Sequence, residues 1–553
     1  MNLNELLEIS KKKSEARLRE IREQLTIPFF RTKDQSLWNG ASRNIVVVGS
    51  GIGGMASGAL FAKIGHKVTV LELNDNLIGG HGRCVSHGDL KFSMGPQYVW
   101  EFGDGQIGDR FLRFLGLKES NPFLPMQRDG FERIFIGGQK NSKNYCCVNF
   151  RVPLGLNPFR WELIALFPEE KDAIHSLFDD MIDIFDVYKS YFRRHYATEG
   201  RFLLATKFLL TSRVNMETKI KLGRSISMSV KDLFDQHRIS PLVRRILYGH
   251  GGIFAESESD MSAIAYIVGT GNYHAGAWYP KNGFYHFFNS LASVIQSSGG
   301  SVETGKRVVR LKTEAGIVTK AVCADGSVYN CDFLFSDISP RLTAKLLGQE
   351  SEDFDYNPSH SIPTCCIGVK GGLPAIADMK GRNYWWQDGN EVNYTAPDIT
   401  RPPRMLFIGS PTANGFGREI ETEDDGLVIF CPGNYDQEKQ IYEKGPEAVK
   451  SYKQRLAADI VDILENHVFP GIHSRLAFAE IISSIDIERD TGGESGNAYG
   501  RRLTADEILK GPIKEENCPA NLYNVSATKN SPGIAAGIFT AELIFEELTG
   551  QAI

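Results

Sequence analysis

The sequence lacks the features that mark several classes of protein. Charged residues interrupt every apolar run before it reaches the roughly 18–20 residues that a membrane-spanning helix needs. The nine cysteines include no C-x-x-C pair, so neither a zinc site nor a dithiol redox site is predicted, and we expect reduced structural thiols. Residues 1–40 have no apolar stretch followed by a small-residue cleavage site, which predicts a cytoplasmic protein rather than a secreted one.

The chain also lacks a strong excess of charge of either sign. It has 62 Lys and Arg against 67 Asp and Glu, a net charge of −5, so no nucleic-acid partner is predicted. The hydrophobic and charged fractions, 42 % and 23 %, are ordinary for a globular protein and exclude a disordered, collagenous or low-complexity chain. At roughly 150 residues per domain, 553 residues predict about three or four domain-sized units.

Periodicity along the chain predicts a coarse organisation. Residues 3–25 have the pattern of an amphipathic helix, which we interpret as an N-terminal extension over 1–42. Residues 155–240 are mostly helical in pattern, and Pro168 with its two following glutamates is typical of a helix start. Strand-like alternation occupies 302–311 and 318–322.

The strongest motif is a glycine-rich turn between a predicted strand and a predicted helix. The segment 49–54 reads Gly-Ser-Gly-Ile-Gly-Gly and fits G-x-G-x-x-G. It follows the apolar run 45–48 and precedes a helical pattern, and the next strand ends at Glu72, close to the spacing of about 20 residues expected of a dinucleotide-binding β-α-β unit. A structural turn without a ligand is the alternative.

Each motif residue has a physical reason to be there. Gly49 permits the tight turn, Gly51 lets the backbone approach a diphosphate, and Gly54 lets helix and strand pack closely. The backbone N–H groups at the helix start bind the anion. The Glu72 carboxylate accepts ribose hydroxyls and repels a 2′-phosphate.

The residues after Glu72 decide which dinucleotide is predicted. Segment 74–83, which ends Gly-Gly-His-Gly-Arg, and segment 92–96, Phe-Ser-Met-Gly-Pro, resemble flavoproteins related to glutathione reductase, in the amine oxidase and phytoene desaturase branch. The resemblance implies FAD. His81 departs from the usual Gly-Gly-Arg, and Arg83 matches the second basic position. His81 is either a neutral histidine held in its loop or a residue facing the flavin.

Three later segments extend the resemblance. Segment 299–311 is similar to the family strand whose valine, here Val308, contacts the adenine, and 331–337 looks like the returning strand. Segment 521–537 resembles the strand, turn and helix whose N-terminus points at the flavin. The residues that the motif and the resemblance together predict to bind FAD are Gly49, Ser50, Gly51, Ile52, Gly53, Gly54, Glu72, Leu73, Gly80, His81, Gly82, Arg83, Gly95, Pro96, Gln97, Val308, Gly533 and Ile534.

Within that branch the chain most resembles the phytoene desaturase, carotenoid isomerase and retinol saturase group. Segments 167–174, 279–283 and 485–500 carry the resemblance. It implies an FAD-dependent oxidoreductase that desaturates, saturates, isomerises or cyclises a lipophilic polyene or isoprenoid. A flavin amine oxidase, with Trp385 and Trp386 as a possible aromatic cage, and a flavin-bound lipid carrier are the alternatives.

The substrate region is predicted less sharply. Residues 155–215 are rich in aromatic side chains that suit either an apolar tunnel or a plain helical core. Residues 201–224 interleave basic and apolar side chains, which fits either peripheral membrane contact or a solvated charged face. No metal site or catalytic side chain is assigned. The candidate substrate-contacting residues are Tyr98, Trp278, Tyr279 and Lys281.

We therefore predict an α/β protein with a Rossmann-type FAD-binding domain built from discontinuous segments. Those segments are 43–120, 285–345 and 478–553. Segments 121–284 and 346–477 are predicted to form a substrate-binding domain of mixed sheet and helix. No oligomeric state is predicted.

Overall fold

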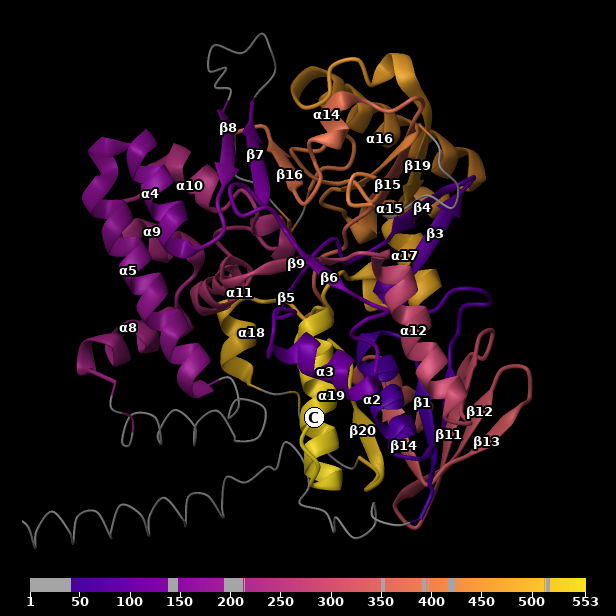
Figure 1. The fold of residues 1–553 in the computed structure, drawn as a ribbon. Helices are drawn as coiled ribbons and strands as arrows, with labels where there is room; N and C mark the ends of the chain where they lie inside the picture. The colour runs from indigo at the N-terminus through magenta and orange to yellow at the C-terminus, as the bar shows by residue number, and fades with distance from the viewer. Residues whose placement is uncertain are drawn as a thin grey trace, which may run out of the picture.

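The computed structural model describes most of the chain beyond its first forty residues (Figure 1). The described residues are 41–137, 148–192, 212, 214–349, 354–389, 394–395, 397–415, 423–511, 513 and 518–553. The predicted N-terminal helix over 3–25 and much of the basic segment 201–224 lie outside them. The described cysteines are free thiols, as expected.

A five-stranded parallel sheet forms the nucleotide-binding half of the molecule. Its strand order is β10-β2-β1-β14-β20, and every neighbouring pair is parallel. The strands are β1 Asn44–Val48, β2 Lys67–Leu71, β10 Ser301–Glu303, β14 Phe333–Ser336 and β20 Leu522–Asn524. Strands far apart in sequence thus meet edge to edge, which is the arrangement expected of a doubly wound α/β fold.

Both faces of this sheet are covered, because alternate side chains of β1 enter different cores. Ile45 and Val47 pack with helices α2 Ile52–Lys63, α12 Gly283–Ser297 and α19 Ile534–Thr549. Val46 and Val48 pack on a three-stranded sheet, made of β11 Val308–Glu314, β12 Ile317–Cys323 and β13 Val328–Asn330. Burial on both faces explains why β1 is a continuous apolar run rather than an alternating one.

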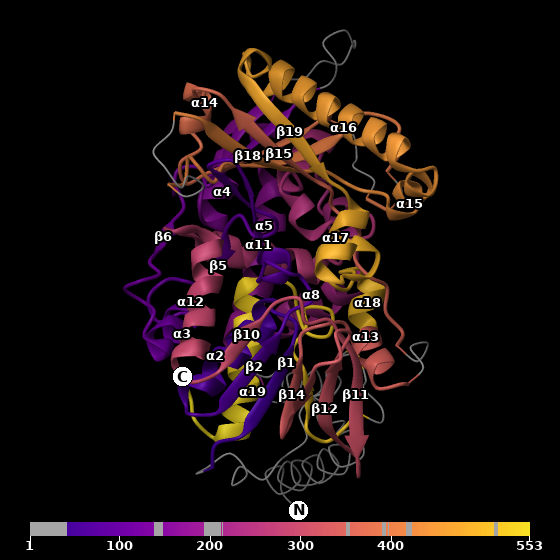
Figure 2. The same ribbon diagram turned by 90° about the vertical axis from the view of Figure 1, so that its right-hand side faces the viewer.

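A second, seven-stranded mixed sheet forms the other half. Its order is β19-β15-β18-β17-β16-β7-β8, with β7 and β16 parallel and the other pairs antiparallel. The strands are β7 Glu132–Ile136, β8 Val148–Val152, β15 Thr364–Val369, β16 Asn383–Gln387, β17 Met405–Gly409, β18 Asp425–Phe430 and β19 Leu476–Ile482. Helix α16, Pro446–His467, lies across this sheet in Figure 2 and buries Ile460 and Leu464 against it.

A helical subregion adjoins the outer edge of the seven-stranded sheet, at β7 and β8 (Figure 1). It contains α4 Leu156–Leu166, α5 Lys171–Val187, α8 Met216–Ser227, α9 Val230–Gln236, α10 Pro241–Leu247 and α11 Ala263–Ala275. Smaller elements complete the fold: β3 Cys84–His87, β4 Leu90–Ser93, β5 Val99–Trp100, β6 Phe123–Pro125, β9 Ala277–Pro280, α3 Ile107–Leu115, α13 Pro340–Leu346, α14 Pro374–Ala377, α15 Tyr435–Glu443, α17 Ser484–Thr491 and α18 Ala505–Lys510. Among the described residues, no helix combines the length and the apolar character needed to cross a membrane.

The predicted α/β class and β-α-β order are confirmed, and one predicted strand is divided. Residues 302–311 do not form a single strand, because β10 belongs to the parallel sheet and β11 to the three-stranded one. The chain turns between them at Gly305, whose φ is +68°, and the Gly305 and Lys306 amides donate to the carbonyls of Asn74 and Glu72. The predicted domain boundaries stay a prediction.

The first testable prediction concerns Asn521, which ties three strands together. Its buried amide accepts from the Val318 N–H at 2.8 Å and donates to the carbonyls of Val318 at 2.8 Å and Asp332 at 2.7 Å. Asn521→Ala removes three hydrogen bonds from a buried position, so we expect a loss of about 2–4 kcal/mol of stability in urea denaturation followed by circular dichroism. Exposed Asn466 makes one such bond, and Asn466→Ala is the control, expected to stay within about 0.5 kcal/mol. Equal midpoints for the two variants would contradict the prediction.

Candidate functional site

The glycine-rich turn joins β1 to α2 and places the first backbone N–H groups of that helix at its end. Gly49 has φ +96°, and its N–H donates to the Leu71 carbonyl at 2.9 Å. Gly51 is the N-cap of α2 and provides no side-chain cap, and no acidic residue lies in the first turn, although the Asp337 carboxyl accepts from the Gly54 N–H from outside the helix. The first N–H groups of a helix lack intrahelical partners, so this turn is a ready anion site.

The glycines of the turn are required by close packing around them. A Cβ on Gly51 would lie 2.5 Å from Oδ2 of Asp337, and one on Gly53 would lie 2.1 Å from the carbonyl oxygen of Val525. A Cβ on Gly54 would lie 2.4 Å from the carbonyl oxygen of Gly49. The start of α2 therefore approaches the carboxyl ends of β14 and β20 as closely as backbone allows.

Glu72 closes the turn from the end of β2. Its buried carboxylate accepts from the Ser50 N–H at 3.0 Å and hydroxyl at 2.5 Å, and from the Asn74 N–H at 2.9 Å. The Ser50 hydroxyl oxygen in turn accepts from the Gly79 N–H at 3.0 Å. One carboxylate and one hydroxyl thus connect the first glycine turn to the second glycine segment.

The second glycine segment supplies a buried cation. Residues Gly80–Gly82 form a 3₁₀ turn, and a Cβ on Gly82 would lie 2.2 Å from the Phe288 ring. The Arg83 guanidinium is 3 % exposed and lies 3.5 Å from the Asp490 carboxylate. Burial lowers the pKa of His81 to about 4, and the nearby Arg83 charge adds to this, so His81 is neutral at pH 7. The positive charge of the segment therefore resides on Arg83.

Asp337 follows β14 and lies against the glycine turn. Its Oδ2 atom has no hydrogen-bond partner among the described residues. Burial raises the pKa of this carboxyl well above its usual range, the Glu72 charge raises it further, and the Gly54 N–H opposes the shift. These effects favour the protonated form of Asp337, which adds no negative charge beside the anion site.

A second uncapped helix start faces the same space. Helix α19 begins after Gly533, which has φ +100°, with no side-chain cap and no acidic residue in its first turn. It packs closely on α2, because a Cβ on Gly537 would lie 2.5 Å from Ile52. Two helix N-termini therefore bring partial positive charge to one cavity.

One cavity runs past both helix starts. Its volume is about 300 Å³, at the lower end of the 300–1,000 Å³ that is usual for a small-ligand site. Beyond the glycine turns its wall is aromatic. We call this part the aromatic end, and its residues are Tyr98, Tyr273, Trp385, Tyr394, Phe407 and Tyr499. No His, Cys, Asp and Glu group in the described part of the chain is arranged to hold a metal ion.

Comparisons with known proteins agree with this geometry. Residues 47–115 match the family model for an NAD(P)-binding Rossmann-like domain. All-trans-retinol 13,14-reductase of Danio rerio is 23 % identical over 522 residues, which is 86 % of this chain and 81 % of that protein. The 4,4'-diaponeurosporene oxygenase of Staphylococcus aureus (strain MRSA252) is 21 % identical over 524 residues, covering 89 % and 95 %. The chain is an oxidoreductase that resembles the phytoene desaturases.

Solved structures support the fold of this phytoene desaturase-like oxidoreductase. A Methanosarcina mazei oxidoreductase superposes with a TM-score of 0.55 at 16 % identity, covering 90 % of this chain and 99 % of that one. Putrescine oxidase bound to putrescine gives a TM-score of 0.57 at 11 % identity, covering 92 % and 100 %. At these identities the likeness concerns the fold alone. The Rossmann match and the glycine turns indicate a flavin or nucleotide cofactor.

The structure brings most of the sequence-predicted residues to the cavity wall. Those that line it are Gly49, Ser50, Gly51, Ile52, Gly53, Glu72, Leu73, Gly80, His81, Gly82, Arg83, Gly95, Pro96, Gln97, Tyr98, Gly533 and Ile534. Gly54 lies buried inside α2, and Val308 lies at the start of β11 without lining the cavity. Trp278 and Tyr279 are on β9, Lys281 is exposed, and none of the three lines it.

Other features of the site were not predicted from the sequence. Asp337, Tyr273 and Tyr394 line the cavity but carried no predicted role; Asp337 follows an apolar strand, and that position was the available signal. The aromatic segment 155–215 was predicted to form either an apolar tunnel or a plain helical core. Phe159 and Phe178 are fully buried in the helical core, which favours the core alternative for the described part of that segment.

Proposed function

We propose that the chain is an FAD-dependent oxidoreductase that acts on C–C or C=C bonds of a lipophilic polyene or isoprenoid. The observation that supports this most is the continuity of the cavity, which joins the anion-binding turn at Gly51 to the aromatic end. A dinucleotide bound at that turn and an apolar substrate bound at the aromatic end would share one enclosed space. Relatives named for retinol and diaponeurosporene support the substrate class.

The residues of this chain fit FAD. The N–H groups at the start of α2 would bind the diphosphate, with the Arg83 cation beside them, and Glu72 would accept ribose hydroxyls. The uncapped start of α19 would favour negative charge on the bound ring system. FAD supplies hydride transfer when bound. The proposed FAD-binding set is the one predicted from the sequence, Val308 and Gly54 included.

The aromatic end favours a polyene over an amine. Its tyrosines, tryptophan and phenylalanine offer large apolar faces, and no carboxylate is among its described lining residues. A protonated amine would gain cation–π contacts there but no counter-ion, whereas a polyene needs neither. A flavin amine oxidase is therefore the weaker alternative.

Access from a membrane surface forms part of the proposal. Helix α8 exposes Met216 and Ile220, which are 66 % and 48 % exposed, and Arg224 lies on its exposed surface. Apolar and basic side chains of this kind suit peripheral contact with an anionic membrane, through which a lipophilic substrate would arrive. Peripheral contact and a cytoplasmic location stay predictions.

The second testable prediction compares the contributions of Arg83 and His81 to FAD affinity. Arg83→Gln removes a buried cation, so FAD affinity is expected to fall at least about tenfold, equivalent to about 1.4 kcal/mol. His81→Gln removes a neutral ring, so the change is expected to stay within about twofold. The dissociation constants are measured by FAD titration of flavin-free protein, with circular dichroism to verify folding.

Gly223→Ala is the control for that titration. Gly223 lies in α8, and a Cβ there would meet no atom within 4 Å. Its FAD affinity should equal that of the wild type. Equal loss in the Arg83 and His81 variants would refute the charge assignment, and protein that binds no FAD would refute the cofactor proposal.

The third prediction tests the reaction itself. FAD-loaded protein, both oxidised and reduced, is mixed without oxygen with all-trans-retinol, 4,4'-diaponeurosporene or putrescine. We expect a polyene to change the visible flavin band, or to be recovered as an isomer, while putrescine changes nothing. Bleaching by putrescine alone would identify an amine oxidase, and an unchanged flavin with unchanged ligands would identify a carrier.

A further inference from the structure

A buried carboxyl lies directly behind the aromatic end. Glu132 starts β7 and is 0 % exposed. The Tyr98 hydroxyl donates a short hydrogen bond to Oε1 of Glu132, and the Trp385 Nε1–H donates to the same atom at 3.1 Å. Tyr98 and Trp385 line the cavity, whereas Glu132 does not. The carboxyl is thus separated from a bound ligand by one tyrosine hydroxyl.

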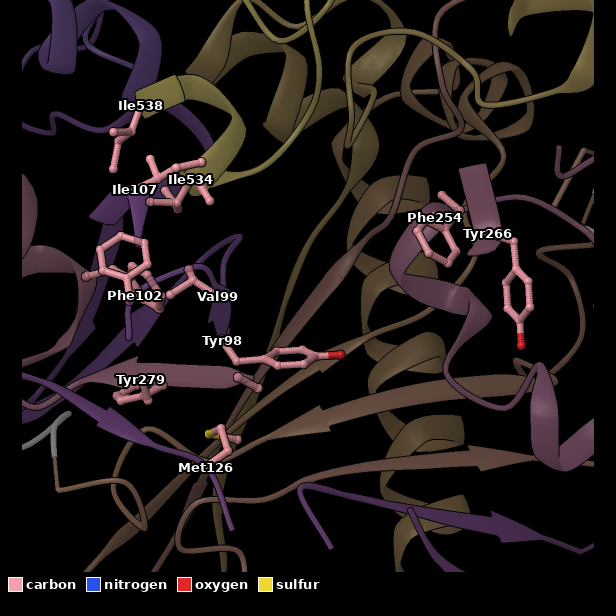
Figure 3. Packing of buried hydrophobic residues seen from close by; sticks show 14 of the residues in the cluster. Tyr98, Val99, Phe102, Ile107, Met126, Phe254, Tyr266, Tyr279, Ile534 and Ile538 are labelled. Carbon is pink, nitrogen blue, oxygen red and sulfur yellow. The ribbon is translucent and has the colours of Figure 1, made fainter. Parts of the chain in front are cut away.

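The orientation of Tyr98 allows this connection. Val99, its neighbour in the chain, packs with Phe102 in the hydrophobic cluster, and Figure 3 shows the Tyr98 oxygen pointing away from both. The Tyr98 ring also lies 4.5 Å from the Tyr273 ring, measured between centroids, which helps to hold it in place. Backbone alternation therefore directs one side chain into the core and the next toward Glu132.

The other groups facing Glu132 leave it without a cation. Nδ1 of His250 lies 3.4 Å from Oε2 of Glu132, but burial lowers the pKa of His250 to about 4, so its ring is neutral near pH 7. His274 lies behind His250, and burial lowers its pKa too. The remaining neighbours, Tyr266 and Tyr273, have raised pKa values and stay protonated.

This environment gives Glu132 two accessible protonation states near neutrality. Burial raises its pKa to about 7, and the hydrogen bonds from Tyr98 and Trp385 keep the pKa from rising further. Its proton is therefore lost only as the pH rises through about 7. Burial, reinforced by the Glu132 charge, raises the pKa of Tyr98 well above its usual range, so its hydroxyl relays a proton without persisting as tyrosinate.

We propose that Glu132 stores the proton of the reaction and that Tyr98 passes it between Glu132 and a carbon of the bound polyene. This inference rests on the proposed function. In the saturating direction the Tyr98 O–H bond breaks as a C–H bond forms, and Glu132 gives its proton to the Tyr98 oxygen. The second alkene carbon receives a hydride from the reduced flavin of the proposed function. Glu132 is left as carboxylate and regains a proton from solvent; desaturation runs in reverse.

A second buried pair in the same chain is a matched control. Glu438 is 0 % exposed, burial raises its pKa to about 7, and the Tyr452 hydroxyl donates to its Oε1 at 3.0 Å. This pair lies on α15 and α16, and neither residue lines the cavity. Like Glu132, Glu438 is buried and accepts from one tyrosine hydroxyl, but its other donors are the N–H and hydroxyl of Ser484, and the pair lies away from the cavity.

The fourth prediction is read first without any substrate. Infrared spectra of FAD-loaded protein between pH 5 and 9 should contain two buried carboxyl bands that titrate near pH 7, one absent in Glu132→Gln and the other in Glu438→Gln. Tyr98→Phe removes a donor to the carboxylate, so it should raise the pKa of the Glu132 band and leave the Glu438 band unchanged. A Glu132 band that does not titrate between pH 5 and 9, or that Tyr98→Phe leaves in place, would overturn the inference.

Turnover of all-trans-retinol and 4,4'-diaponeurosporene gives the second readout. Tyr98→Phe and Glu132→Gln should lower kcat about 100-fold or more, with FAD affinity unchanged, and Tyr452→Phe should stay within twofold. The wild-type kcat for saturation should fall as the pH rises through about 7, because Glu132 then loses the proton that it must give. This pH dependence should be lost in Glu132→Gln.

The outcomes distinguish the two levels of the proposal. If the wild type converts neither polyene, the proposed function is overturned and this inference with it. If the wild type converts a polyene, and Tyr98→Phe and Glu132→Gln both match its rate and pH profile, only the assignment of the proton to Glu132 and Tyr98 is overturned. Equal losses in Tyr98→Phe and Tyr452→Phe would also overturn it, because a general effect of losing a buried tyrosine hydroxyl would explain both.

Discussion

The site depends on the N–H groups at the starts of α2 and α19, which have no partner within their own helix. Both helices leave the parallel sheet at its carboxyl edge, their N-cap glycines provide no side-chain cap, and their first turns hold no acidic residue. Their partial positive charges converge on one cavity, and Gly51, Gly53 and Gly537 let the backbones approach closely enough to shape it. Burial, with the Glu72 charge adding to it, raises the pKa of Asp337 well above its usual range and so favours the protonated form, which adds no negative charge to the same enclosed space.

The two halves of the molecule contribute chemically different groups to the cavity. The nucleotide-binding half presents backbone donors after its parallel sheet and the buried Arg83 after the turn Gly80–Gly82, which suit an anionic cofactor. The seven-stranded sheet presents Trp385 and Phe407 on its cavity side and holds Glu132 behind them. Polar recognition and apolar substrate contact are thus built on rigid sheets that meet at one space, which suits the precise positioning that redox catalysis requires.

The nucleotide half was largely predictable from the sequence, because its signals are local. A few neighbouring residues suffice to predict each of its main features: the turn at 49–54, the strand ending at Glu72 and the helix after Gly533. The structure confirms the parallel sheet. The division of 302–311 at Gly305 was missed, because alternation continues across the turn. Glu132 was also missed, because its proposed role depends on hydrogen bonds from Tyr98 and Trp385, which are distant in sequence. The aromatic residues around Phe178 suited a tunnel and a core equally, and burial decided between them.

A crystal structure of the protein with FAD and a bound polyene tests the central claim most directly. The account predicts diphosphate oxygens within hydrogen-bond distance of the N–H groups between Gly51 and Gly53. It also predicts the flavin ring at Gly533 and Ile534, with the polyene against Tyr98 and Trp385. A dinucleotide bound outside this cavity, or one whose diphosphate lies at α19, would contradict the account.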